Sequence, residues 1–98
     1  MIKLTEIFSN PKQYDPATET VLESYGVREV FLNPRYVISV KENLSLYEKS
    51  QREELIEGLN RDFLFTELYL ATPGSSPQRL DILGSPAHIS EKISEAWK

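Results

Sequence analysis

Apolar and polar residues alternate along much of this chain, with the period of two that is typical of β-strands. The alternation is clearest over residues 30–40, where two apolar stretches flank the pair Asn33-Pro34. Pro34 has no N–H to donate to a strand ladder, and it disfavours helical backbone at Asn33. The sequence therefore predicts strands at 27–33 and 35–42, with a turn or sharp bend between them.

Three further segments predict strands. Residues 1–8 alternate and contain β-branched side chains, while residues 65–71 and 78–83 flank a short turn segment. Within that turn, Pro73 supplies a fixed φ and Gly74 can adopt the positive φ of a type II turn. We expect 65–71 and 78–83 to pair as a hairpin.

Two segments carry helical signals. The insertion at about 44–62 holds two serine–glutamate pairs at capping-box spacing and then apolar residues at helical spacing, which predicts a short helix at about 50–59. Near the C-terminus, Ser85 is placed to cap a helix that has Pro86 at its first position. We expect this helix to pack on a sheet face through its apolar stripe, which consists of Ile89, Ile93, Ala96 and Trp97.

Residues 9–20 contain Asn10-Pro11 and Asp15-Pro16 with few apolar side chains, and they predict a loop. Residues 21–26 fit either a helical turn or the start of the next strand. Together the segments predict a single α+β domain over residues 1–98. Its parts are a small curved antiparallel sheet of about five strands, a C-terminal amphipathic helix and a short inserted helix.

The composition is that of a globular protein, with 40% apolar and 27% charged residues among 98. A net charge of −4 repels phosphate backbones at long range, which disfavours general nucleic-acid binding. The chain contains no cysteine, so it forms no disulfide and no thiolate metal site. It begins without the apolar run of a signal peptide and has no stretch of about 20 apolar residues, so we expect a cytoplasmic protein that does not contact membranes.

No combination of residues predicts catalysis. His88 is the only histidine, and the nearby Ser85 is already used to cap the predicted helix. The turn at Gly74 lacks the second glycine of a nucleophile elbow and the lysine of a phosphate-binding loop. We therefore expect no enzymatic activity, no cofactor, no metal and no small-molecule substrate.

Residues 63–71 carry apolar side chains on both faces of a predicted strand. Either a helix and the proline-containing loop cover the two faces inside the protein, or one face is a surface for a partner. The candidate partner-binding residues are Phe63, Phe65, Tyr69 and Trp97. The alternative function is a small regulator that contacts RNA or a transcription component through a basic patch of Arg28, Arg35, Lys41 and Arg79.

The order of these elements resembles a known family. The opening Met-Ile-Lys-Leu-Thr, the stretch Phe31-Leu32-Asn33-Pro34, the hairpin 66–83 and Gly84-Ser-Pro before a helix are similar to the small FlbD proteins of flagellar operons. The resemblance covers about residues 1–5, 28–40 and 66–93, and it leaves two insertions unmatched. It implies the same architecture and a partner-binding module without enzymatic activity; short accessory proteins encoded by phages are also similar.

From the residues and this resemblance, we expect an accessory or adaptor protein. It would act by protein–protein contact through a sheet face or edge, as a homo-oligomer or as a subunit of a larger assembly.

Overall fold

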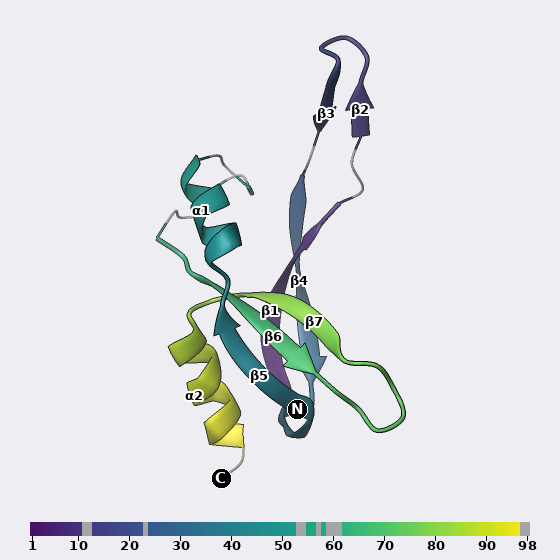
Figure 1. Cartoon of the computed structure of the whole chain (residues 1–98). Coiled ribbons are helices and arrows are strands. Elements are labelled where there is room, and N and C mark those ends of the chain that lie inside the picture. The colour runs from purple at the N-terminus through teal and green to yellow at the C-terminus, as the bar shows by residue number, and fades with distance from the viewer. Residues whose placement is uncertain (11–12, 23, 53–54, 57, 59–61, 97–98) are drawn as a thin grey trace.

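The computed structural model describes residues 1–10, 13–22, 24–52, 55–56, 58 and 62–96. In these residues the elements follow one another as β1 (Ile2–Ser9), β2 (Gln13–Asp15), β3 (Thr20–Leu22), β4 (Tyr25–Leu32), η1 (Pro34–Tyr36), β5 (Val37–Glu42), α1 (Leu44–Arg52), β6 (Phe65–Leu70), β7 (Gln78–Leu83) and α2 (Pro86–Ala96). The protein is α+β, with a curved antiparallel sheet of five strands and a C-terminal helix, which confirms the predicted fold class (Figure 1).

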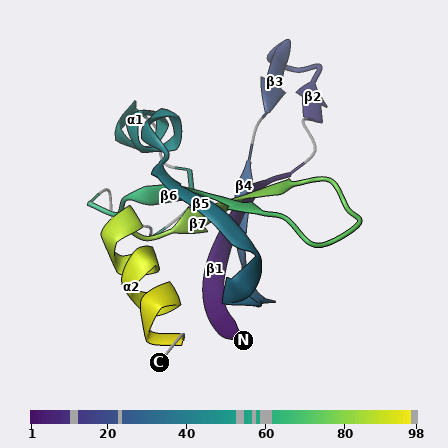
Figure 2. The ribbon, with the colours of Figure 1, turned by 60° about the horizontal axis from the view of Figure 1, so that its bottom comes forward.

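The five-stranded sheet has the order β4-β1-β7-β6-β5 and is antiparallel throughout. Its two edge strands, β4 and β5, are joined by the short connection 33–36, so the sheet curls strongly enough for the edges to approach at that end (Figure 2). All five strands contribute apolar side chains to one core on the concave face. The buried members of this core are Leu4, Leu32, Leu68, Ile82 and Ile89.

Asn33 and Pro34 form the predicted turn. The Asn33 side chain accepts a hydrogen bond from the Arg35 N–H at 3.0 Å and caps η1, a short 3₁₀ turn. Because Arg35 and Tyr36 lie in this turn, β5 begins at Val37, and the predicted strand start at 35 is wrong.

The hairpin of β6 and β7 is confirmed, with pairs running from Phe65 and Leu83 to Leu70 and Gln78. In its turn, the Ser75 N–H donates to the Thr72 carbonyl at 3.1 Å, and Gly74 has the positive φ of 80° that a type II turn requires.

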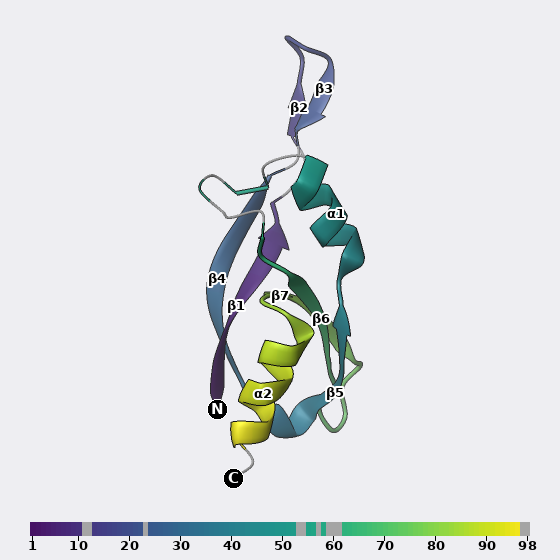
Figure 3. The ribbon, with the colours of Figure 1, turned by 90° about the vertical axis from the view of Figure 1, so that its left-hand side faces the viewer.

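The C-terminal helix α2 begins as predicted. The Ser85 hydroxyl accepts a hydrogen bond from the His88 N–H at 3.1 Å, and Pro86 occupies the first helical position. Ile89 is buried in the concave core and Ile93 packs against it, so α2 covers this face of the sheet beside β5 (Figure 3).

The inserted helix α1 starts at Leu44 rather than near residue 50, which corrects the prediction. Asn43 is its cap: its side-chain oxygen accepts a hydrogen bond from the Leu46 N–H at 3.1 Å, and its amide donates to Asp81 at 3.0 Å. Helix α1 ends at Arg52, and part of the predicted helix (53–54, 57 and 59) lies outside the described residues. On the convex face of the sheet, beneath α1, a second core forms from Ile7, Leu46, Leu55 and Phe65.

The segment 9–20, predicted as a loop, contains most of a second, two-stranded sheet of β2 and β3. The Asp15 carboxylate accepts a hydrogen bond from the Ala17 N–H at 3.0 Å, and Glu19 adopts a positive φ of 55° to close the turn. Of the two interpretations of 21–26, the lead-in to a strand is correct. The hairpin extends from the sheet end where β1 stops and β4 starts, and gives the molecule extents of 54 × 33 × 20 Å (Figure 1).

Candidate functional site

The structure separates the predicted partner-binding residues. Phe65 is fully buried, with 0% of its surface exposed, because α1 and Leu55 cover the convex face of β6. It is therefore not part of a free surface, and its inclusion was wrong. Phe63 is 45% exposed but precedes β6, and the half-buried Tyr69 donates a hydrogen bond to Glu67. Trp97 lies outside the described residues.

Both faces of β6 are covered by the chain itself. Leu68 is fully buried under α2 on the concave face, and Phe65 is fully buried under α1 on the convex face. The explanation by internal cover is therefore correct for the centre of this strand: α2 covers one face, and α1 together with Leu55 covers the other.

The four candidate basic residues do not gather into one patch. Arg28 lies on the edge strand β4. It is directly opposite Glu6 of β1, so both side chains are on the same face of the two-stranded ribbon formed by β1 and β4. Lys41 and Arg79 lie on the convex face in β5 and β7, and Arg35 lies in η1. Arg28 binds Glu6, Arg79 binds carboxylates, and Lys41 lies 5.5 Å from the centre of the Tyr69 ring.

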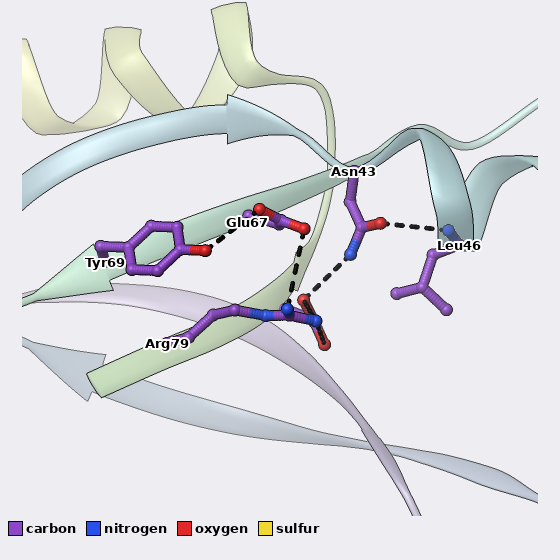
Figure 4. A network of polar contacts seen from close by, with 6 residues as sticks. Asn43, Leu46, Glu67, Tyr69 and Arg79 are labelled. Atoms are coloured by element: carbon purple, nitrogen blue, oxygen red, sulfur yellow. Dashed lines mark hydrogen bonds and ion pairs between the residues drawn. The ribbon is translucent and has the colours of Figure 1, made fainter. Parts of the chain in front are cut away.

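A polar network occupies the convex face where α1 begins (Figure 4). The Arg79 guanidinium lies 3.2 Å from Asp81 and 3.8 Å from Glu67, and Asp81 also accepts the amide hydrogen bond from Asn43. The hydrogen bond to Asp81 is the main reason why the pKa of Arg79 is raised above its ordinary value. The network thereby ties the cap of α1 to β7.

This network borders a groove of about 430 Å³ between α1 and the sheet. Lys49, which also lines it, donates a hydrogen bond to the Tyr25 hydroxyl at 2.9 Å. The carboxylates of Glu67 and Asp81 are engaged by Arg79 and Asn43, so neither is placed as a general base beside a nucleophile. We interpret the groove as part of the polar packing interface between α1 and the sheet.

The described residues hold no cluster of three or more histidine, cysteine, aspartate or glutamate side chains that could bind a metal ion. Within the same residues, every buried side-chain nitrogen or oxygen has a hydrogen-bond partner. The exposed His88 is at the start of α2, away from the polar network.

A different kind of surface lies at the opposite end of the sheet. There, a hollow of about 220 Å³ opens between the end of β4, η1 and the strands β6 and β7. We call it the apolar hollow; its apolar lining consists of Met1, Phe31, Leu32, Tyr36 and Leu70, and its polar rim of Asn33, Thr72, Ser76 and Gln78. Phe31 is 62% exposed and Tyr36 is 38% exposed, so both aromatic side chains present apolar surface to solvent.

The sequence contains the signal for this surface. Phe31 and Leu32 are adjacent in β4 and point to opposite sides of it, and Leu32 is the buried one. An aromatic residue on the polar side of an alternating strand indicates a contact surface. The prediction was instead based on residues 63–71, which contain more apolar side chains.

Comparison of the chain with models of protein families, with curated proteins and with solved structures found no match. The similarity to FlbD proteins therefore stays a prediction. Among the residues that the structure describes, none of the helices combines the length and the apolar character needed to cross a bilayer.

Proposed function

We propose that this protein is a non-enzymatic accessory or adaptor protein that binds another protein through the apolar hollow. The observation that carries the proposal is the exposure of Phe31 and Tyr36 beside a recess with an apolar lining and a polar rim. Aromatic and methionine side chains at the centre, with polar residues around them, are characteristic of protein–protein interfaces.

The position of the hollow supports the same function. The hollow is surrounded by two separate turns, the connection that contains Asn33 and Tyr36 and the turn that contains Thr72, and both are held by the curled sheet. The Ala71 N–H donates to the Tyr36 carbonyl at 2.9 Å, which fixes η1 against the end of β6. A partner would thus meet a preformed recess, which lowers the entropic cost of binding.

The alternative function, contact with RNA through a basic patch, has less support. Arg28, Lys41 and Arg79 lie on different sides of the sheet, and two of them already bind carboxylates. A phosphate backbone needs cations along one continuous path, so this distribution disfavours it.

The test uses a substitution that fills the hollow without removing a core side chain. Ser76 is exposed on the rim, so Ser76→Arg is expected to leave folding intact and to block entry. In quantitative affinity capture from cells of the source organism, we expect the variant to retain less than about a tenth of the main captured protein.

Ala87→Arg is the matched control, because it adds the same charge at an exposed position on α2. It should capture as much partner as the unmodified protein. Equal capture by Ser76→Arg, with an unchanged unfolding curve, would refute binding at the apolar hollow.

A further inference from the structure

The two edges of the five-stranded sheet differ in how they are protected. β5 has an irregular register between Val37 and Ser39, with Ile38 bulged out, and α2 lies against it (Figure 3). Bulges and covering helices are the usual devices that prevent an edge strand from pairing with another chain. The β5 edge is therefore blocked.

Within the described residues, β4 has neither a bulge nor a covering helix. It is eight residues long, contains no proline, and pairs with β1 in unbroken register from Tyr25 to Leu32. Among the described residues, no strand pairs with the outer N–H and C=O groups between Val27 and Phe31, so this part of β4 can accept a further strand.

The side chains of β4 also favour an added strand. Val27 and Phe31 lie on the same face of β4, and they are 45% and 62% exposed. The charges between them are already paired with β1: Arg28 lies 2.7 Å from Glu6, and Glu29 lies 3.6 Å from Lys3. Charged residues usually deter edge pairing by repulsion, but these are neutralised within the chain.

We propose that β4 pairs antiparallel with β4 of a second copy, with the two-fold axis at Glu29, to form a continuous sheet of ten strands. Residues directly opposite each other in a sheet lie on the same face, so the axis must pass through a residue position. An axis at Glu29 places Val27 of each copy opposite Phe31 of the other, which forms an apolar pair on both sides of the axis.

Neighbouring registers lack this match. An axis at Arg28 places two arginines opposite each other and sets Val27 against Glu29, and an axis at Val30 sets Glu29 against Phe31. At the Glu29 axis the two carboxylates face each other, but each is held by its own Lys3, so the row of four charges is neutral.

This inference goes beyond the proposed function, because it concerns the backbone edge of β4, although Phe31 belongs both to this edge strand and to the lining of the hollow. Ser76→Arg tests the hollow and leaves the backbone edge of β4 unchanged. A failure of either proposal therefore leaves the other standing.

The chain has no cysteine, so single cysteines report directly on the register. Residues opposite each other in an antiparallel pair have Cα atoms about 4.5–5.5 Å apart, within the range of a disulfide. Under mild oxidation we expect Glu29→Cys to form covalent dimers. Val27→Cys alone and Phe31→Cys alone should not, because each residue would lie about 13 Å from its copy, whereas a mixture of the two should form the mixed dimer.

Glu48→Cys, at an exposed position on α1, is the control for the rate of cross-linking by random collision. Cross-linking of Glu29→Cys no faster than this control, or cross-linking of Arg28→Cys that is at least as efficient, would overturn the proposal.

A second measurement needs no cysteine. In sedimentation equilibrium, the unmodified protein should dimerise with rising concentration, and Val27→Lys should weaken the dimer about tenfold, since the apolar pair occurs twice. Glu48→Lys should not weaken it. The proposal would also be overturned if the unmodified protein stays monomeric, or if the Val27→Lys variant dimerises as strongly as the unmodified protein.

Discussion

At the scale of single residues, Arg28 is tied to the body of the protein by Glu6. The Glu6 side chain is only 10% exposed, and its carboxylate lies 2.7 Å from Nε of Arg28. The Arg28 guanidinium also lies 4.7 Å from the centre of the Phe8 ring, a distance typical of cation–π contact. Arg28, singled out as a candidate for nucleic-acid contact, is thus part of the structure of the ribbon formed by β1 and β4.

This contact predicts a coupling between the two residues. Arg28→Ala should lower the free energy of unfolding by about 1–2 kcal/mol, because it leaves a largely buried carboxylate without its partner, an effect reduced by the exposure of the arginine. Urea denaturation followed by circular dichroism measures the loss.

The double variant Arg28→Ala, Glu6→Leu removes the stranded carboxylate and adds an apolar group beside Ile82. It should recover most of the lost stability. If the double variant is less stable than Arg28→Ala, the ion pair with Glu6 is not the contact that holds Arg28.

At the scale of elements, the hairpin of β2 and β3 is the part that the sequence pattern did not predict. Apolar alternation identified the five body strands, because each one buries a face. The hairpin is instead defined by its turn, through the Asp15 side chain and the positive φ of Glu19, and neither leaves a periodic signal. The start of α1 was missed for a related reason: Asn43 is held by Asp81, which is distant in sequence.

The hairpin should be dispensable for folding. Its strands pair with each other in a separate sheet, and a lone two-stranded hairpin adds little stability. Because Asn10 and Ser24 are bridged by a backbone hydrogen bond of 2.8 Å, residues 11–23 can be replaced by Asn-Gly, which suits a tight hairpin turn.

We expect the shortened protein to unfold at the same urea concentration. By small-angle X-ray scattering its radius of gyration should fall from the 15.3 Å of the full chain towards about 12 Å, the value for a compact domain of this size. Loss of the cooperative transition would show that the hairpin stabilises the sheet.

At the scale of the whole molecule, each helix covers part of the sheet, with α2 on the concave face and α1 over one part of the convex face (Figure 2). The fold class could be predicted because burial imposes the apolar pattern. The contact surface could not be located in the same way. The packing of the helices decides which apolar strand face stays uncovered, and the sequence pattern does not show where the helices pack. Phe65 and Phe31 both lie in strands with apolar neighbours, and tertiary packing buries the first and leaves the second exposed.

The central claim is that the apolar hollow contacts another protein. Photo-crosslinking from within it tests this most directly, with benzoylphenylalanine introduced at Ser76 and, as the control, at Ala87, in cells that produce the protein. Our account predicts, from position 76 only, a discrete covalent adduct whose mass exceeds that of this chain by the mass of a different protein. Adducts that are absent at position 76, or equally abundant at position 87, would contradict it.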